Sequence, residues 1–104
     1  SSKIYVTFST PVYKGGGNAH GITTIFRGTV SGTNLGNTNW GFGARYNSQS
    51  FDSTSTNAGS ILDSPSTISA QTYTIGLRTN SGSVNVVAQG NNGMGTITLM
   101  EIAG

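Results

Sequence analysis

The stretch Gln71-Thr72-Tyr73-Thr74-Ile75-Gly76-Leu77-Arg78-Thr79 decides the fold class, because its apolar and polar residues alternate strictly. Tyr73, Ile75 and Leu77 share one face, and the residues between them share the other. A period of two residues is typical of a half-buried β-strand. No stretch of the chain has a helical period, and the helix-forming residues are scarce. The sequence therefore predicts an all-β protein.

The segments that follow this stretch predict more strands joined by short turns. Asn80-Ser81-Gly82-Ser83 favours a tight reversal, because Asn and Gly accept a positive φ. A strand around Val84, Val86 and Ala88 comes next, followed by a turn at 90–93 and a closing strand at 96–102. We therefore expect the last third of the chain to form a three-stranded meander.

The closing strand is apolar on both faces. Ile97 and Leu99 lie on one face, and Met100 and Ile102 lie on the other. Such a strand is typically buried on both sides. In a domain this small, we expect a neighbouring subunit to supply the second covering, so these four residues are the candidate oligomer interface.

The upstream part of the chain predicts further strands. Residues 2–9 alternate, and Pro11 should end the pairing of that strand because proline has no N–H for the ladder, with Val12 and Tyr13 as an extension beyond it. Residues 22–30 form a second long strand, in which Gly28 suggests a bulge or a close approach by another backbone. Residues 40–46 alternate aromatic residues with glycine, whereas residues 48–60 are interpreted as an exposed loop or a short edge strand. Seven to nine strands in one domain, residues 1–104, indicate an antiparallel two-sheet β-sandwich, jelly-roll-like.

Composition restricts the function classes. The 104 residues contain no cysteine, and only 8% are charged. The net charge of +2 comes from scattered basic residues, whereas nucleic-acid binding needs a basic patch, so we expect no nucleic-acid partner. No apolar run approaches the ~20 residues of a membrane span, and no stretch is typical of a signal peptide. We expect no membrane insertion.

Few residues could carry catalysis. His20 lies in a Gly-rich stretch without a neighbouring partner and is interpreted as an exposed loop residue. Asp52 and Asp63 could pair for glycoside hydrolysis, which needs carboxyl groups ~5–9.5 Å apart, but their Ser- and Thr-rich surroundings favour turn-making. A buried Glu101 would need a cation such as Arg27, Arg45 or Arg78, so we expect a structural ion pair within or between subunits. We predict no catalytic residue, no cofactor and no metal site.

Aromatic residues are the candidate ligand contacts, because sugar rings stack on exposed aromatic faces. The candidates are Tyr13, Trp40, Tyr46 and Phe51. Alternation with glycine favours a core position for Trp40 and Tyr46, together with Phe42. Tyr13 and Phe51 are expected in loops and are the better candidates for exposed contacts.

Two C-terminal segments resemble a known family. The run from Asp63-Ser64-Pro65 to Arg78 and the run Gly95-Thr96-Ile97-Thr98-Leu99-Met100-Glu101-Ile102-Ala103-Gly104 resemble the C-terminal ends of virion structural and tail-fibre-like proteins of tailed phages, especially marine and cyanobacterial ones. Those ends contain D-x-P, a T-Y-x-V/I strand and a terminal S/T-x-I-T-x-M/L-E-I. The resemblance covers roughly residues 60–104 well, and the upstream part fits only in style. It implies a compact sandwich similar to the jelly-roll heads of the TNF/C1q type, assembled as a trimer at a particle surface.

The resemblance implies a non-enzymatic virion protein, the homotrimeric head of a tail fibre or similar appendage that attaches to a host-surface glycan or protein. Other virion proteins would be partners. The lack of cysteine fits a protein made in the bacterial host cytoplasm and placed on the virion surface. One alternative is a capsid decoration or cement protein that stabilises the phage head. A second is a glycan-active enzyme, although the chain lacks the long β-helix and carboxylate cluster of tailspike enzymes.

Overall fold

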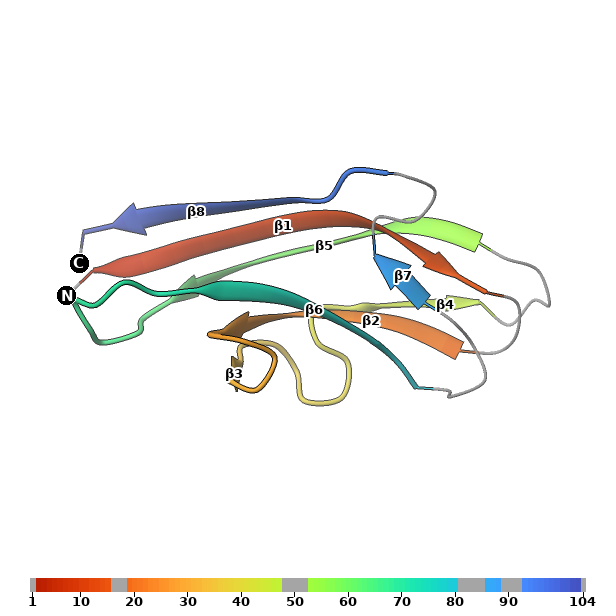
Figure 1. Ribbon diagram of the computed structural model, residues 1–104, viewed down its shortest axis with the longest axis horizontal. Helices are drawn as coiled ribbons and strands as arrows, with labels where there is room; N and C mark the ends of the chain where they lie inside the picture. Colours follow the sequence, from red (N-terminus) through yellow and green to blue (C-terminus); the bar gives the residue numbers. More distant parts are fainter. Residues whose placement is uncertain (1, 16–18, 48–52, 81–85, 89–92, 104) are drawn as a thin grey trace.

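The computed structural model of the chain is all-β, with two antiparallel four-stranded sheets stacked as two layers (Figure 1). It describes residues 2–15, 19–47, 53–80, 86–88 and 93–103, and the side chains of these residues except 19, 44–47 and 53. The prediction of an all-β, two-sheet architecture is confirmed. No helix occurs in these ranges.

Each sheet is built around one long central strand. Sheet A consists of β1 (Lys3–Lys14), β5 (Ser53–Asp63), β7 (Val86–Ala88) and β8 (Thr96–Ile102). In it, β1 pairs with β5 on one side and with β7 and β8 on the other. Sheet B consists of β2 (Ala19–Arg27), β3 (Thr33–Asn34), β4 (Ala44–Asn47) and β6 (Tyr73–Thr79), with β2 between β6 and the pair β3 and β4.

The core lies between the two central strands. Inward and outward residues alternate along β1, where Val6 and Phe8 are buried and Tyr5 and Thr7 are more exposed. Val6 and Phe8 meet the fully buried Ile25 of β2. Partly buried side chains from other strands and loops complete this cluster, namely Ile4, Leu35, Phe42, Ile61, Tyr73 and Ile75.

The predicted C-terminal meander is wrong. β6 pairs with β2 in sheet B, whereas β7 and β8 pair with β1 in sheet A. The chain therefore changes layer between β6 and β7. The change has a physical reason, because it places Tyr73 and Ile75 of β6 against the apolar residues of β1, where a hairpin would have left the two apolar faces side by side.

Contrary to the prediction, Pro11 does not end the pairing of the first strand with β5. β1 continues to Lys14 and keeps its register with β5 throughout, with Pro11 opposite Thr56. The missing N–H matters on the other side of β1. There β8 begins opposite Ser9, and β7 ends opposite Val12, so neither strand pairs with residues 10 and 11.

Three further boundaries differ from the prediction. β2 ends at Arg27 because Gly28 has a φ of 94°, which leaves the extended region. β5 is an eleven-residue strand, and its residues 53–60 fall in the region interpreted as an exposed loop or a short edge strand. Trp40–Gly43 is a turn and not a strand, because Gly41 and Gly43 have φ values of 58° and 129°.

Candidate interaction surfaces

The closing strand β8 is exposed on both faces. Ile97, Leu99, Met100 and Ile102 are 45%, 49%, 56% and 40% exposed. The single chain therefore covers neither face of β8 completely, and the expected covering by a neighbouring subunit stays a prediction. The reason is its place in the fold, because β8 pairs only with β1 within the described part of the chain and lies at the edge of sheet A.

On the outer face of sheet A, the apolar side chains of β8 join those of two other strands. Met100 lies opposite Tyr5 of β1, and Tyr5 lies opposite Leu62 of β5. All three are exposed, and Ile102 is the next outward residue along β8. We call these four residues the outer apolar row. Sequence reasoning missed Tyr5 and Leu62, because only the register between the strands aligns them with Met100.

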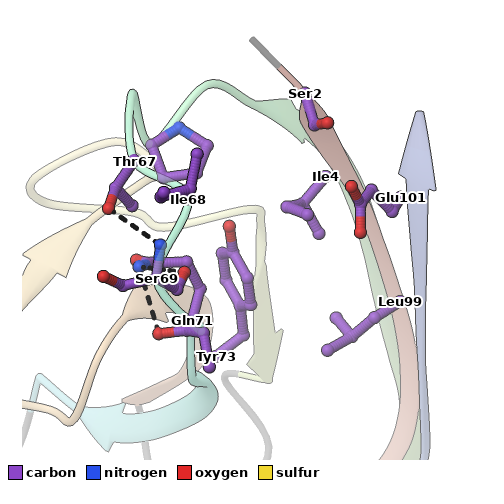
Figure 2. A pocket seen from close by; sticks show the side chains of 11 residues that line it. Ser2, Ile4, Thr67, Ile68, Ser69, Gln71, Tyr73, Leu99 and Glu101 are labelled. Carbon is purple, nitrogen blue, oxygen red and sulfur yellow. Dashed lines mark hydrogen bonds between the residues drawn. The ribbon is translucent and has the colours of Figure 1, made fainter. Parts of the chain in front are cut away.

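On the inner face, Leu99 and Glu101 of β8 line an open cleft of ≈460 Å³. Figure 2 shows that Ile4 and Leu99 point toward Tyr73, across from the segment that carries Ile68. This segment, residues 64–72, connects β5 to β6 and is held by local bonds such as that from the Ser69 N–H to the Thr67 hydroxyl, 3.1 Å. The cleft is mostly apolar and lies beside the edge strand.

A second cleft of ≈220 Å³ lies between the sheets further along β8. It is lined by Ile97, by Phe8 of β1 and by Ile75 and Leu77 of β6, with other residues. The two clefts show that the sandwich is incompletely filled where β6 and β8 face each other. The opposite side, between β2 and β5, is bridged by the Asn57 amide, which donates to the Thr23 hydroxyl (3.1 Å) and the Gly21 carbonyl (3.3 Å).

Asp63 joins the two sheets at one end of the sandwich. Its carboxylate is buried and accepts two hydrogen bonds from the Arg27 guanidinium, the one from Nε at 2.7 Å. The Tyr73 hydroxyl donates a third, also at 2.7 Å. The hydrogen bonds from Arg27 hold the pKa of Asp63 below its usual value, whereas burial and the hydrogen bond to Asp63 raise the pKa of Tyr73 to about 12.

This geometry revises the interpretation of Asp63. It is the last residue of β5 and makes a buried ion pair, in addition to any role in the turn that follows. A glycosidase general acid must hold a proton near neutral pH. Asp63 is deprotonated there and its oxygens are occupied, so it gives the enzyme alternative no support. Asp52 lies outside the described residues.

Trp40 lies on the outer face of sheet B, in the turn between β3 and β4, and is 47% exposed. The expected core position of Trp40 is therefore wrong, although Phe42 packs against the core. The indole meets the ring of His20 at a centroid distance of 4.8 Å, with 60° between the planes. Arg78 donates to the carbonyl of Asn39, the residue before Trp40.

Among the other aromatic candidates, only Tyr13 has a described side chain, and it belongs to sheet A, whereas Trp40 lies in a turn of sheet B. Tyr13 lies within β1, half-buried on the outer face of sheet A, and not in a loop as expected. Tyr46 belongs to β4, where it pairs with His20, but its side chain is not described. Phe51 lies outside the described residues.

His20 and Glu101 also differ from expectation. His20 is the second residue of β2 and not a loop residue. Its backbone N–H donates to the side-chain oxygen of Asn80 at 2.8 Å, and its Nδ1 lies 2.9 Å from the Asn80 amide nitrogen. Glu101 is exposed, and the predicted pair with Arg27 is replaced by the Arg27–Asp63 pair. Among the described side chains Glu101 makes no salt bridge.

Comparisons with protein-family models, curated proteins and solved structures find no match. Within the described ranges, no group of three His, Cys, Asp or Glu residues could hold a metal ion. No helix in these ranges is long and apolar enough to cross a membrane. The surfaces that stand out chemically are thus the apolar ones around β8 and the polar, aromatic one around Trp40.

Proposed function

We propose that this chain is a non-enzymatic virion protein of a tailed phage, the homotrimeric head of a tail fibre or similar appendage that attaches to the host surface. The observation that carries the proposal is β8, an edge strand with exposed apolar side chains on both faces. Exposed apolar edge strands invite pairing or packing with another chain. The resemblance of residues 60–104 supports the phage assignment, the jelly-roll type and the number of copies.

The single chain buries little apolar surface. A monomer of 10.7 kDa usually exposes about 5,500 Å², whereas this chain exposes 5999 Å². Only five apolar side chains are buried in the described part of the chain: Val6, Phe8, Val12, Ile22 and Ile25. Small domains with thin cores are commonly stabilised by association. Covering β8 with other copies would enlarge the core.

The oligomeric state tests this proposal directly. We expect the wild-type chain to sediment as a trimer and Met100→Asp or Leu99→Asp to sediment as a monomer, because each places a charge in the apolar contact. Thr56→Asp is the matched control, since Thr56 is exposed on β5 at the far edge of sheet A. A wild-type monomer at high micromolar concentration would contradict the proposal.

A capsid decoration or cement protein is the second candidate. The chain measures 49 × 24 × 16 Å, and this elongated, flat form would suit a clamp lying across neighbouring capsid subunits. Copy number separates the two roles. Particle imaging should find a few tens of copies or fewer for an appendage head and hundreds for a cement protein, and absence from particles would remove both.

A further inference from the structure

We propose that Trp40, His20 and Arg78 form a binding site for an acidic saccharide, a sugar that carries a carboxylate. The inference rests on the proposed attachment role and names the class of ligand for it. Three features of the outer face of sheet B support it, namely a fixed exposed indole, a groove beside it that carries polar groups on a largely apolar lining, and the exposed guanidinium of Arg78.

The Trp40 indole is held in place before any ligand arrives. The Asn37 side chain accepts hydrogen bonds from the backbone N–H of Asn39 (2.9 Å) and of Trp40 (3.0 Å). The backbones of Asn37 and Gly41 bond each other in both directions, at 2.8 and 2.9 Å. The ring contact with His20 then fixes the indole from one side. A preorganised aromatic face loses little entropy when a sugar ring stacks on it.

A groove of ≈210 Å³ lies next to this turn. Its lining is largely apolar, for example at Phe26 and Leu77. Asn37, Thr38 and Arg78 add amide, hydroxyl and guanidinium groups that a ligand could meet. Gly76 makes room for the Phe26 ring beside the groove, because a Cβ there would come within 2.6 Å of that ring. The volume is below the ~300–1,000 Å³ of sites that enclose drug-sized ligands. It therefore suits one sugar unit that lies against an open surface.

The charge around the groove favours an acidic sugar. A guanidinium has five N–H donors in a planar fork that matches a carboxylate, and Arg78 is exposed with one of them given to Asn39. The two described carboxyl groups, Asp63 and Glu101, belong to β5 and β8 of the other sheet. A ligand carboxylate at Arg78 would thus meet a cation without a competing acid among the described residues.

Trp40 is the only tryptophan of the chain, so its fluorescence reports directly on this site. The probes are oligosaccharides of galacturonate, glucuronate, mannuronate and sialic acid, each titrated beside its carboxyl-reduced neutral counterpart. We expect at least one acidic probe to change the fluorescence with saturation and its neutral counterpart to bind at least tenfold more weakly. Raising NaCl from 20 to 500 mM should weaken the binding of the acidic probe, because salt screens its attraction to Arg78.

Variants locate the site. Arg78→Gln should raise the Kd of the acidic probe about tenfold or more, since a charged hydrogen bond is worth about 1.5–3 kcal/mol. Arg78→Lys keeps the charge without the planar fork and should give a smaller increase. Lys3→Gln removes the same charge from the start of β1 and should leave the Kd unchanged. Trp40→Ala should abolish binding, which is then measured by calorimetry because this variant has no tryptophan fluorescence.

The outcomes separate this inference from the proposed assembly. No saturable change with any acidic probe, or equal affinity for the neutral counterparts, would overturn the acidic-saccharide site, as would a Kd that Arg78→Gln and Lys3→Gln alter equally. None of these results depends on sedimentation. A trimer without sugar binding would leave the assembly proposal standing, whereas a monomer that binds sugar would leave the site standing alone.

Discussion

At the scale of single residues, Gly59 shows how closely the two sheets approach. It lies on the inward face of β5, opposite Phe8. Its missing side chain leaves room for Phe8 and Phe42, whose rings meet edge to face at 6.3 Å. A Cβ at Gly59 would come within 2.8 Å of the Phe42 ring and 3.0 Å of the Phe8 ring. The glycine is therefore required by packing.

Gly59→Ala should lower the free energy of unfolding by about 1–3 kcal/mol, the usual cost of overfilling a packed core. Urea denaturation measures it. Ser60→Ala is the control, because Ser60 is exposed on the other face of the same strand and its substitution should change the free energy by less than about 0.5 kcal/mol. Equal stabilities of the wild type and Gly59→Ala would mean that the two rings can move apart.

At the scale of elements, the turn that carries Trp40 depends on Asn37. The side chain of Asn37 is the acceptor for two backbone N–H groups of the turn. Such Asx-type bonds replace the ladder partners that a strand would provide. They explain how a stretch of alternating aromatic residues becomes a turn.

Asn37→Ala should loosen this turn. We expect a red shift of the Trp40 emission, because the indole would leave the His20 ring for water, and a loss of about 1 kcal/mol in unfolding free energy. Asn39→Ala is the matched control, since its backbone and not its side chain makes the bond to Arg78. An unchanged emission spectrum in Asn37→Ala would show that the remaining backbone bonds hold the turn alone.

The elements also show what could be predicted from sequence. β1, β2 and β6 were predicted because apolar residues alternate in them, and β8 was predicted from a short run that is apolar on both faces. β5 was largely missed, since its inward positions include Ser55, Asn57 and Gly59, which carry no hydrophobic period. The sheet that receives β6 could not be predicted, because the Asn80–Ser83 turn signal does not distinguish a hairpin from a change of layer.

The residues of the candidate sites could be predicted from their chemistry, but their exposure and their neighbours in the fold could not. The four β8 residues and Trp40 were singled out by their chemistry. Their exposure follows from the position of β8 at a sheet edge and from the positive φ values of Gly41 and Gly43. His20 and Arg78 lie far from Trp40 in the chain, so no sequence spacing brings them together.

At the scale of the whole molecule, the Arg27, Asp63 and Tyr73 group should set the pH range of stability. The lowered pKa of Asp63 gives stability that is present above its unfolded value and is lost as the pH falls through the folded pKa, below 3.8. The raised pKa of Tyr73 gives stability that is present below pH 10 and is lost between 10 and about 12.

We therefore expect a plateau of unfolding free energy between about pH 5 and 9, with a decline on each side. Tyr73→Phe should reduce the alkaline decline, and Asp63→Asn should lower the plateau by about 2–3 kcal/mol and weaken the acid decline. Urea midpoints from pH 3 to 11 measure both. Tyr5→Phe, on the outer face of sheet A, is the control. An alkaline limb that Tyr73→Phe leaves as steep would contradict the assignment.

The antiparallel pairing of β1 with β8 places Lys3 directly opposite Ile102. The start of one strand and the finish of the other are thus neighbours at the same end of the molecule (Figure 1). A linker of a few residues could join them as a hairpin loop. The polypeptide could then be reopened within residues 64–72 to make a circular permutant with both new ends beside the larger cleft.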